Sequence, residues 1–272
     1  MTVTTKMLAN PRWTSPLPTA EITLARFAFG ALAMAPLLFV RSARLLGQDK
    51  RGLVWRGLTG GLAVYAYFLA ISHTTLTKAV LLNMTSVIFA PMFAWLFLRE
   101  RITRTALLGI TLAVVGVLFV TRPRPSALVI GDAYGLLSGV LAGMALTAVR
   151  RLRQQETASA VFFYFSLVGI PVSLIAMIGS QPVWPDAMGW RLLLIMSASS
   201  IGAQVLMTYG YRYVTTSEGV LITLSQIAYA AIAGAVLFDE PVAAMTIIGA
   251  GLILLAGIAA TRPQRIAAHG HR

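Results

Sequence analysis

Long apolar runs alternate with short polar connections from residue 20 almost to the end of the chain. Each run holds about 20 mostly apolar residues, the length that an α-helix needs to cross a bilayer. Short connections place consecutive helices antiparallel in one bundle. The pattern predicts nine membrane-spanning helices, at 20–40, 53–73, 79–98, 105–121, 131–149, 158–180, 190–211, 217–238 and 242–261.

One stretch of this pattern occurs twice. Residues 68–123 align without a gap with residues 208–263, at an offset of 140. Only 10 of the 56 aligned positions are identical, but the polar turn, the carboxylate after the long apolar run and the closing Thr-Arg-Pro coincide. The two segments begin five spans apart, and an odd offset inverts the second copy relative to the first. Inverted repeats of this kind are typical of secondary transporters.

Composition supports a membrane protein. Hydrophobic residues make up 57% of the chain and charged residues 11%, whereas soluble domains carry about 25% charged residues. The net charge of +13 does not indicate nucleic acid, because the cations lie between the spans, where they set topology and meet anionic headgroups. The chain has no cysteine, which excludes disulfides and thiolate metal sites.

The distribution of Lys and Arg predicts the orientation. The connections after the odd-numbered spans hold fifteen of these residues, with Arg56 counted in the first, and the other side holds six. The more basic side is expected to be cytoplasmic. We therefore expect a multi-pass protein of the inner (plasma) membrane with its C-terminus inside and its N-terminus outside.

The repeat divides the chain into four parts. We expect a polar N-terminal tail at 1–19, a first repeat of four spans at 20–123, a second repeat of five spans at 131–262 and a basic tail at 263–272. The equivalent of span 131–149 is missing from the first half. Either the chain begins outside the membrane or its start is incomplete.

The sequence resembles the EamA-like members of the drug/metabolite transporter superfamily, which carry two tandem EamA repeats. The resemblance rests on Arg26 in the first span and on the segments AISHTTLTKAVLLNMTSVIFAPMFAWLFLRERIT, GDAYGLLSGVLAGMALTAVRRL and EGVLITLSQIAYAAIAGAVLFDEPVAAMTIIGAGLILLAG. In both halves an apolar run ends in a glutamate and a glycine-containing span follows. The resemblance implies an all-α, ten-helix inverted-repeat transporter fold around a central cavity, here without its first helix.

Polar and aromatic residues in mid-span are the candidate cavity lining. Hydrocarbon leaves hydrogen-bonding groups unpaired, so these side chains should face the bundle interior. Ser86 and Gln226 match across the repeat and predict a symmetric pair of surfaces near the midplane. The alternative is hydrogen bonding between helices. The candidates are Asn83, Ser86, Gln226, Tyr229, Gln204, Tyr65, Trp95 and Tyr209.

Charged residues give three gate or charge candidates. Arg26 lies inside the first span, where a cation is a functional candidate by default, although it could also reach the interface or bind carbonyls. Lys78 and Glu218 occupy equivalent positions at the starts of two spans, and a helix cap also explains Glu218. Glu100 and Glu240 end two spans, and for Glu100 we expect a structural ion pair with neighbouring arginines.

A ridge of small residues follows span 131–149. Glycine recurs every four residues, which lets helix backbones approach closely in lipid. The ridge fits either a sliding surface or static close packing. Its members are Gly131, Gly135, Gly139 and Gly143.

These patterns predict a secondary transporter, importer or exporter, of a small organic metabolite such as an amino acid or related zwitterion. Alternating access between the inverted repeats would move the solute across the lipid bilayer. We expect no enzyme activity, no cofactor, no metal and no nucleic acid partner, and a homodimer is possible. No carboxylate lies deep in a span, which argues against a multidrug cation exporter. The alternatives are a non-transporting or truncated membrane partner and, less favoured, an integral membrane lipid enzyme.

Overall fold

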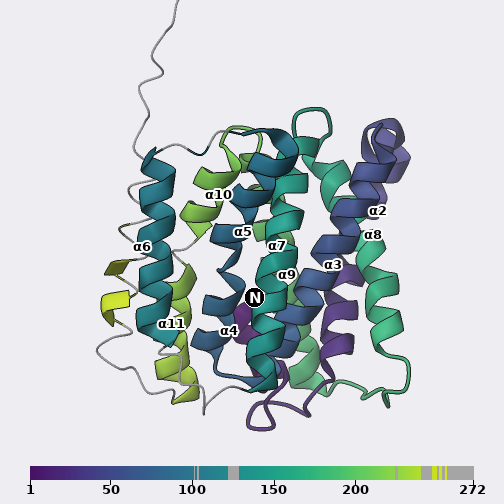
Figure 1. Ribbon diagram of the computed structural model, residues 1–272. Coiled ribbons are helices and arrows are strands. Elements are labelled where there is room, and N and C mark those ends of the chain that lie inside the picture. Colours follow the sequence, from purple (N-terminus) through teal and green to yellow (C-terminus); the bar gives the residue numbers. More distant parts are fainter. Residues whose placement is uncertain are drawn as a thin grey trace, which may run out of the picture.

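A computed structural model shows how the chain folds (Figure 1). It describes residues 1–100, 102, 104–121, 129–223, 226–239, 247–249, 251, 252 and 255. In this part of the chain all regular structure is helical, so the prediction of an all-α protein is confirmed. The helices are α1 Thr2–Leu8, α2 Thr19–Leu46, α3 Lys50–His73, α4 Leu76–Asn83, α5 Ser86–Phe93, the π-helical turn η1 Ala94–Leu98, α6 Arg104–Thr121, α7 Ile130–Leu152, α8 Ala158–Ala176, α9 Ala187–Gly210, α10 Thr216–Thr223 and α11 Gln226–Phe238.

Five helical segments are long and apolar enough to cross a membrane: Lys50–His73, Leu76–Leu98, Ile130–Leu152, Ala158–Ala176 and Ala187–Gly210. They coincide with five of the predicted spans. The ninth predicted span, 242–261, lies mostly outside the described residues, so the count of nine stays a prediction. Several helices begin where the sequence supplies an oxygen cap. Asp49, Thr75, Thr157 and Asp186 each accept a hydrogen bond from a backbone N–H three residues later.

One predicted span does not form a continuous α-helix. Span 79–98 is interrupted at Met84 and Thr85, between α4 and α5. Span 217–238 holds α10 up to Thr223 and α11 from Gln226 on, and residues 224 and 225 lie outside the described part of the chain. Helices α4 and α10 begin 140 residues apart, at the offset of the sequence repeat. Figure 1 shows α5 above α4 but α10 above α11, so the two equivalent segments run in opposite directions.

The interruption has a local cause. The Thr85 hydroxyl donates to the carbonyl of Leu82 at 2.7 Å, and the Thr85 N–H also bonds to this carbonyl at 3.2 Å, a spacing of three residues. Short side-chain hydrogen bonds of this kind compete with the regular helical ladder. The result is a turn at Met84 and Thr85 instead of a continuous helix.

The largest buried cluster in the described part of the chain surrounds the α4–α5 interruption. It joins apolar residues of α3, α4, α5, α9 and α11, including Phe68, Met84, Met196 and Ile227. The short helix α1 also enters it through Leu8, which is fully buried. Residues 2–8 of the expected polar tail are therefore packed into the bundle. At the offset of 140 they correspond to 142–148, the second half of α7.

Candidate functional site

The glycine ridge of α7 lies against the interrupted helix α4–α5. A Cβ atom at Gly139 would approach the Leu82 carbonyl oxygen within 2.8 Å, and one at Gly143 would approach the Ala90 nitrogen within 2.9 Å. Gly131 similarly meets the backbone of His73, and Gly135 meets the side chain of Leu82. The ridge thus brings α7 into backbone contact with the point where α4 ends.

The α4–α5 interruption contacts a polar side chain of the second repeat. Gln226, the first residue of α11, donates from Nε2 to the sulfur of Met84 at 3.2 Å. Asn83 lies beside Met84 at the end of α4, and its Nδ2 donates to the hydroxyl of Ser138 on α7 at 2.9 Å. The structure thus brings the predicted residues Asn83 and Gln226 to one region. In this conformation Asn83 makes the interhelical hydrogen bond that was the alternative to a cavity role.

The other predicted cavity residues are more dispersed. Ser86 is buried at the start of α5, and Tyr65 of α3 and Gln204 of α9 are half-buried. Three aromatic residues are more than half exposed on the surface of the single chain. They are Trp95, Tyr209 and Tyr229, and Tyr229 is 72% exposed.

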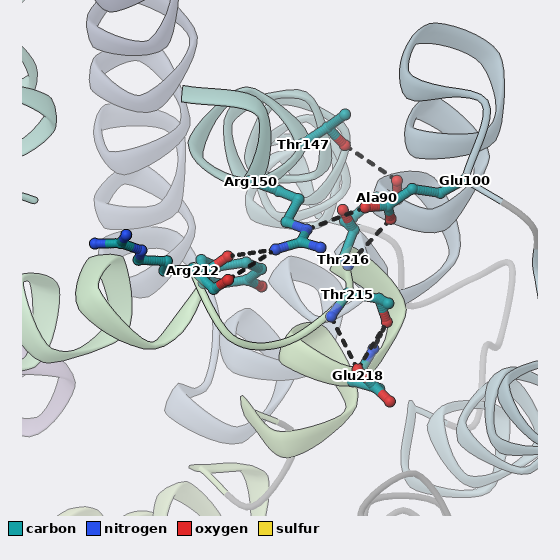
Figure 2. A network of polar contacts seen from close by, with 9 residues as sticks. Ala90, Glu100, Thr147, Arg150, Arg212, Thr215, Thr216 and Glu218 are labelled. Carbon is teal, nitrogen blue, oxygen red and sulfur yellow. Dashed lines mark hydrogen bonds and ion pairs between the residues drawn. The ribbon is translucent and has the colours of Figure 1, made fainter. Parts of the chain in front are cut away.

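A polar network closes the end of the bundle that the sequence predicts to be cytoplasmic (Figure 2). Glu100 accepts from Nε of Arg150 at 3.1 Å and from the backbone N–H of Thr216 at 3.2 Å. Arg150 also donates from Nη1 to the carbonyls of Tyr211 and Arg212, both at 3.1 Å. The ion pair of Glu100 is therefore with Arg150, fifty residues away on α7. The structural ion pair expected for Glu100 thus has a partner on another helix, while Arg101, one of the neighbouring arginines, lies outside the described residues.

Lys78 and Glu218 have different environments although they are equivalent in the repeat. Lys78 donates from Nζ to Asp132 of α7 at 2.6 Å, which joins the starts of α4 and α7. Glu218 accepts from the Thr215 N–H at 2.9 Å while its own N–H donates to the Thr215 hydroxyl at 3.3 Å. This reciprocal pair is a capping box at the start of α10, visible in Figure 2. Glu240 lies outside the described residues.

Arg26 is buried deep in the bundle, with 6% of its surface exposed. Its Nε donates to the hydroxyl of Ser200 on α9 at 2.5 Å. The guanidinium carbon lies 5.5 Å, 5.9 Å and 5.4 Å from the ring centres of Phe27, Phe68 and Phe165. Its Nη1 has no hydrogen-bond partner among the residues that the structure describes. Arg26 therefore does not reach an interface.

Arg56 is a second buried cation that the charge count misplaced. The count assigned it to a cytoplasmic connection, but it lies within α3 and is 2% exposed. Its guanidinium carbon is 4.4 Å from the ring centre of Phe165, and both Nε and Nη1 lack hydrogen-bond partners. The burial of Arg56 could have been predicted from its position inside the predicted span 53–73.

The environment of the two arginines does not offset the free energy of burying their charges. Removing one ion from water costs on the order of several kcal/mol even after relaxation. A desolvated contact with an aromatic face returns about 2 kcal/mol. The ion pairs found in the described part of the chain are Arg12–Asp239, Lys78–Asp132 and Arg150–Glu100, and none includes Arg26 or Arg56. The described residues also contain no group of three His, Asp or Glu side chains that could hold a metal ion.

An antiparallel bundle of long apolar helices defines a multi-pass membrane protein. The sequence profile of the EamA-like transporter family matches this chain twice, at residues 3–122 and 129–261. The chain therefore belongs to the EamA-like transporter family, and the resemblance predicted from its motifs is confirmed. It is a membrane solute transporter by family.

Individual relatives agree with this assignment. The chain is 32% identical over 250 residues to the pseudopaline exporter CntI of Pseudomonas aeruginosa, covering 92% of this chain and 88% of the exporter. It is 23% identical over 201 residues to a riboflavin transporter of Brucella anthropi, covering 72% of this chain and 71% of the transporter. A protein of known crystal structure superposes with a TM-score of 0.70 at 19% identity, covering 95% of this chain and 90% of that one. The last comparison supports the fold alone.

Proposed function

We propose that this protein is a secondary transporter that moves a small organic metabolite, such as an amino acid or related zwitterion, by alternating access between two inverted halves. The contact that carries this proposal is the hydrogen bond from Gln226 of the second repeat to Met84, where the helix of the first repeat is interrupted. An interrupted helix is a common way to build a solute site inside a membrane protein.

The chemistry of a helix interruption fits a zwitterion. At the α4–α5 break, the carbonyl end of α4 carries partial negative charge and the amide end of α5 carries partial positive charge. The ammonium group of a zwitterion would find a complementary carbonyl end at this break, and the amides of Asn83 and Gln226 can donate or accept. Two relatives are named for the export of pseudopaline and the transport of riboflavin, which supports an organic solute.

Contacts at the two ends of the bundle support the alternating step. At the end predicted to be cytoplasmic, Glu100 of the first half holds the N–H of Thr216 in the second half at 3.2 Å. At the opposite end, Arg12 and Asp239 join the two halves at 3.1 Å, with side chains 64% and 81% exposed. Alternating access requires these two connections to open in turn. We propose the Glu100 network as the inner gate.

A transport assay on the purified protein tests the proposal. Proteoliposomes loaded with one unlabelled amino acid or related metabolite at a time are given the same solute in radiolabelled form, and counterflow is measured. We expect counterflow of at least one neutral or zwitterionic solute, reduced about tenfold by Asn83→Ala and by Gln226→Ala because each loses a hydrogen bond to the solute. Gln181→Ala is the matched control, since Gln181 lies exposed before α9.

The outcomes separate the parts of the proposal. Wild-type rates in both the Asn83 and the Gln226 variants would remove this region as the solute site. Absence of counterflow for every solute, or strong uptake of lipophilic cations instead, would contradict the proposed function.

We also propose that the C-terminus is cytoplasmic. Because the chain has no cysteine, a single cysteine at Gln154 or at Ser180, both exposed and at opposite ends of α8, is labelled uniquely. A membrane-impermeant maleimide added to intact cells should label Ser180→Cys and not Gln154→Cys. The reverse pattern would contradict the orientation.

A further inference from the structure

Two buried arginines converge on one aromatic ring. Arg26 from α2 and Arg56 from α3 place their guanidinium carbons 5.4 Å and 4.4 Å from the ring centre of Phe165 on α8. Helix α9 completes the surroundings through Ser200, which accepts from Arg26 at 2.5 Å. Four helices therefore contribute to one buried site that is separate in sequence from the interrupted helix α4–α5.

The unpartnered atoms of this site are all able to donate hydrogen bonds. Among the described residues no partner is found for Nη1 of Arg26, for Nε and Nη1 of Arg56, or for the hydroxyl of Ser197, which lies one turn before Ser200 on α9. Guanidinium groups donate and never accept. Two such cations match a ligand group that accepts hydrogen bonds and carries negative charge, and they repel an ammonium group.

The carboxylates of the described chain are engaged elsewhere. Glu100, Asp132 and Asp239 pair with other cations. Glu156 accepts from the backbone N–H groups of Gln48 and Asp49. The four others cap helices or bind loop backbone. Two positive charges at one ring, without a described counter-charge, are most stable when an anion joins them.

We propose that Arg26 and Arg56 bind a carboxylate of the transported solute. This proposal rests on the proposed function and adds the substrate class, an organic carboxylate with an apolar portion. The planar guanidinium groups offer parallel N–H donors that match the two oxygens of a carboxylate. The rings of Phe27, Phe68 and Phe165 supply an apolar wall beside them.

Binding of a matched pair of probes tests the site without requiring transport. The full chain is purified in detergent, and its thermal unfolding is followed by tryptophan fluorescence with benzoate or with benzamide at constant ionic strength. The two probes share the ring and differ in the carboxylate. We expect benzoate to raise the unfolding temperature in a saturable way and benzamide to leave it unchanged, because ligand binding stabilises the folded state.

Variants assign the effect to the two arginines. Arg26→Gln and Arg56→Gln should each weaken the apparent affinity for benzoate by about tenfold, since each loses a charge-assisted hydrogen bond. Ser197→Ala keeps the charge and a nearly equal volume, and should weaken benzoate binding about threefold if either arginine variant fails to fold. Arg191→Gln, on the exposed start of α9, is the control and should bind benzoate as the wild type does.

Two results would overturn the proposal. In one, neither benzoate nor any other carboxylate changes the unfolding temperature of the wild type. In the other, chloride or phosphate stabilises the protein as well as benzoate does, which makes this a site for an inorganic anion.

The counterflow assay separates the two proposals. Counterflow of a solute without a carboxylate, at wild-type rates in Arg26→Lys and Arg56→Lys, would leave transport standing and refute the solute-binding role. Benzoate binding that depends on both arginines, in a protein without counterflow of any solute, would support the site and contradict the proposed transport.

Discussion

Gly139 is the position where the packing of the interrupted helix is most open to a direct test. The perturbation is Gly139→Ala, which adds one methyl group to α7. The new Cβ would lie 2.8 Å from the carbonyl oxygen of Leu82 and 3.1 Å from that of Asn83. Both are backbone atoms at the end of α4, so neither can move aside by a change of rotamer. The helices must separate or the turn must rearrange.

The magnitude follows from two opposing terms. Overpacking of this kind costs about 1–3 kcal/mol, while Gly→Ala inside a helix gains about 1 kcal/mol. Because the contact is with backbone, we take the upper part of that range and expect a net loss of roughly 2 kcal/mol. Gly202→Ala on α9 is the matched control, since a Cβ there meets no atom within 4 Å. The control should be stabilised by about 1 kcal/mol.

Thermal unfolding in detergent, followed by tryptophan fluorescence, measures both variants. Gly139→Ala should unfold roughly 5 °C below the wild type, and Gly202→Ala at or slightly above it. If both variants shift in the same direction by the same amount, the effect is one of helix propensity alone. The close approach of α7 to the α4–α5 break would then not contribute to stability.

Three further predictions concern charged residues. Glu100→Gln and Arg150→Gln should show a coupling free energy of about 1 kcal/mol in a double-mutant cycle of thermal stability, and additive losses would contradict the ion pair. Hydrogen bonds from the Thr14 hydroxyl and from backbone N–H groups hold the pKa of Asp186 below its usual range. The carboxylate thus stabilises the fold above about pH 4 and loses this effect as pH falls through its lowered pKa, so Asp186→Asn should reduce the fall in unfolding temperature between about pH 5 and 3. Glu218→Ala should cost about 1 kcal/mol through loss of the capping box and leave counterflow unchanged, whereas lost counterflow at wild-type stability would favour a gate.

The sequence was sufficient for the helices because hydropathy is a local property. Five predicted spans appear as long apolar helices with small differences at their ends, and oxygen caps such as Asp49 and Thr157 mark where helices begin. The sequence also revealed the internal repeat. The offset of 140 residues that aligns the two segments equally separates the starts of α4 and α10, at Leu76 and Thr216.

The interruption at Met84 and Thr85 was not predicted, because hydropathy does not report the hydrogen bonds and the packing that form it. An apolar span with one Asn, one Thr and one Ser reads as a continuous helix by hydropathy. In the structure, Thr85 binds the Leu82 carbonyl and Gly139 of α7 packs directly on the same carbonyl. The polar run from Asn83 to Ser86 was the available signal, since such side chains compete for backbone hydrogen bonds. Nothing in the local sequence indicated that α7 would supply the other half of the contact.

Phe68 connects the two candidate sites. Its ring lies in the central cluster that contains Met84 at the α4–α5 interruption and Ile227 beside Gln226, and the guanidinium carbon of Arg26 is 5.9 Å from its centre. Met196 of α9 belongs to the same cluster and precedes Ser197, whose buried hydroxyl has no hydrogen-bond partner among the described residues. A zwitterion that places its carboxylate at Arg26 and Arg56 would therefore extend past Phe68 toward Gln226. Because close-packed interiors shift between discrete arrangements and do not deform continuously, a change at the arginines would reach the interrupted helix α4–α5 through this ring. The two proposals thus describe two ends of one solute path, and Phe68 is the residue that both share.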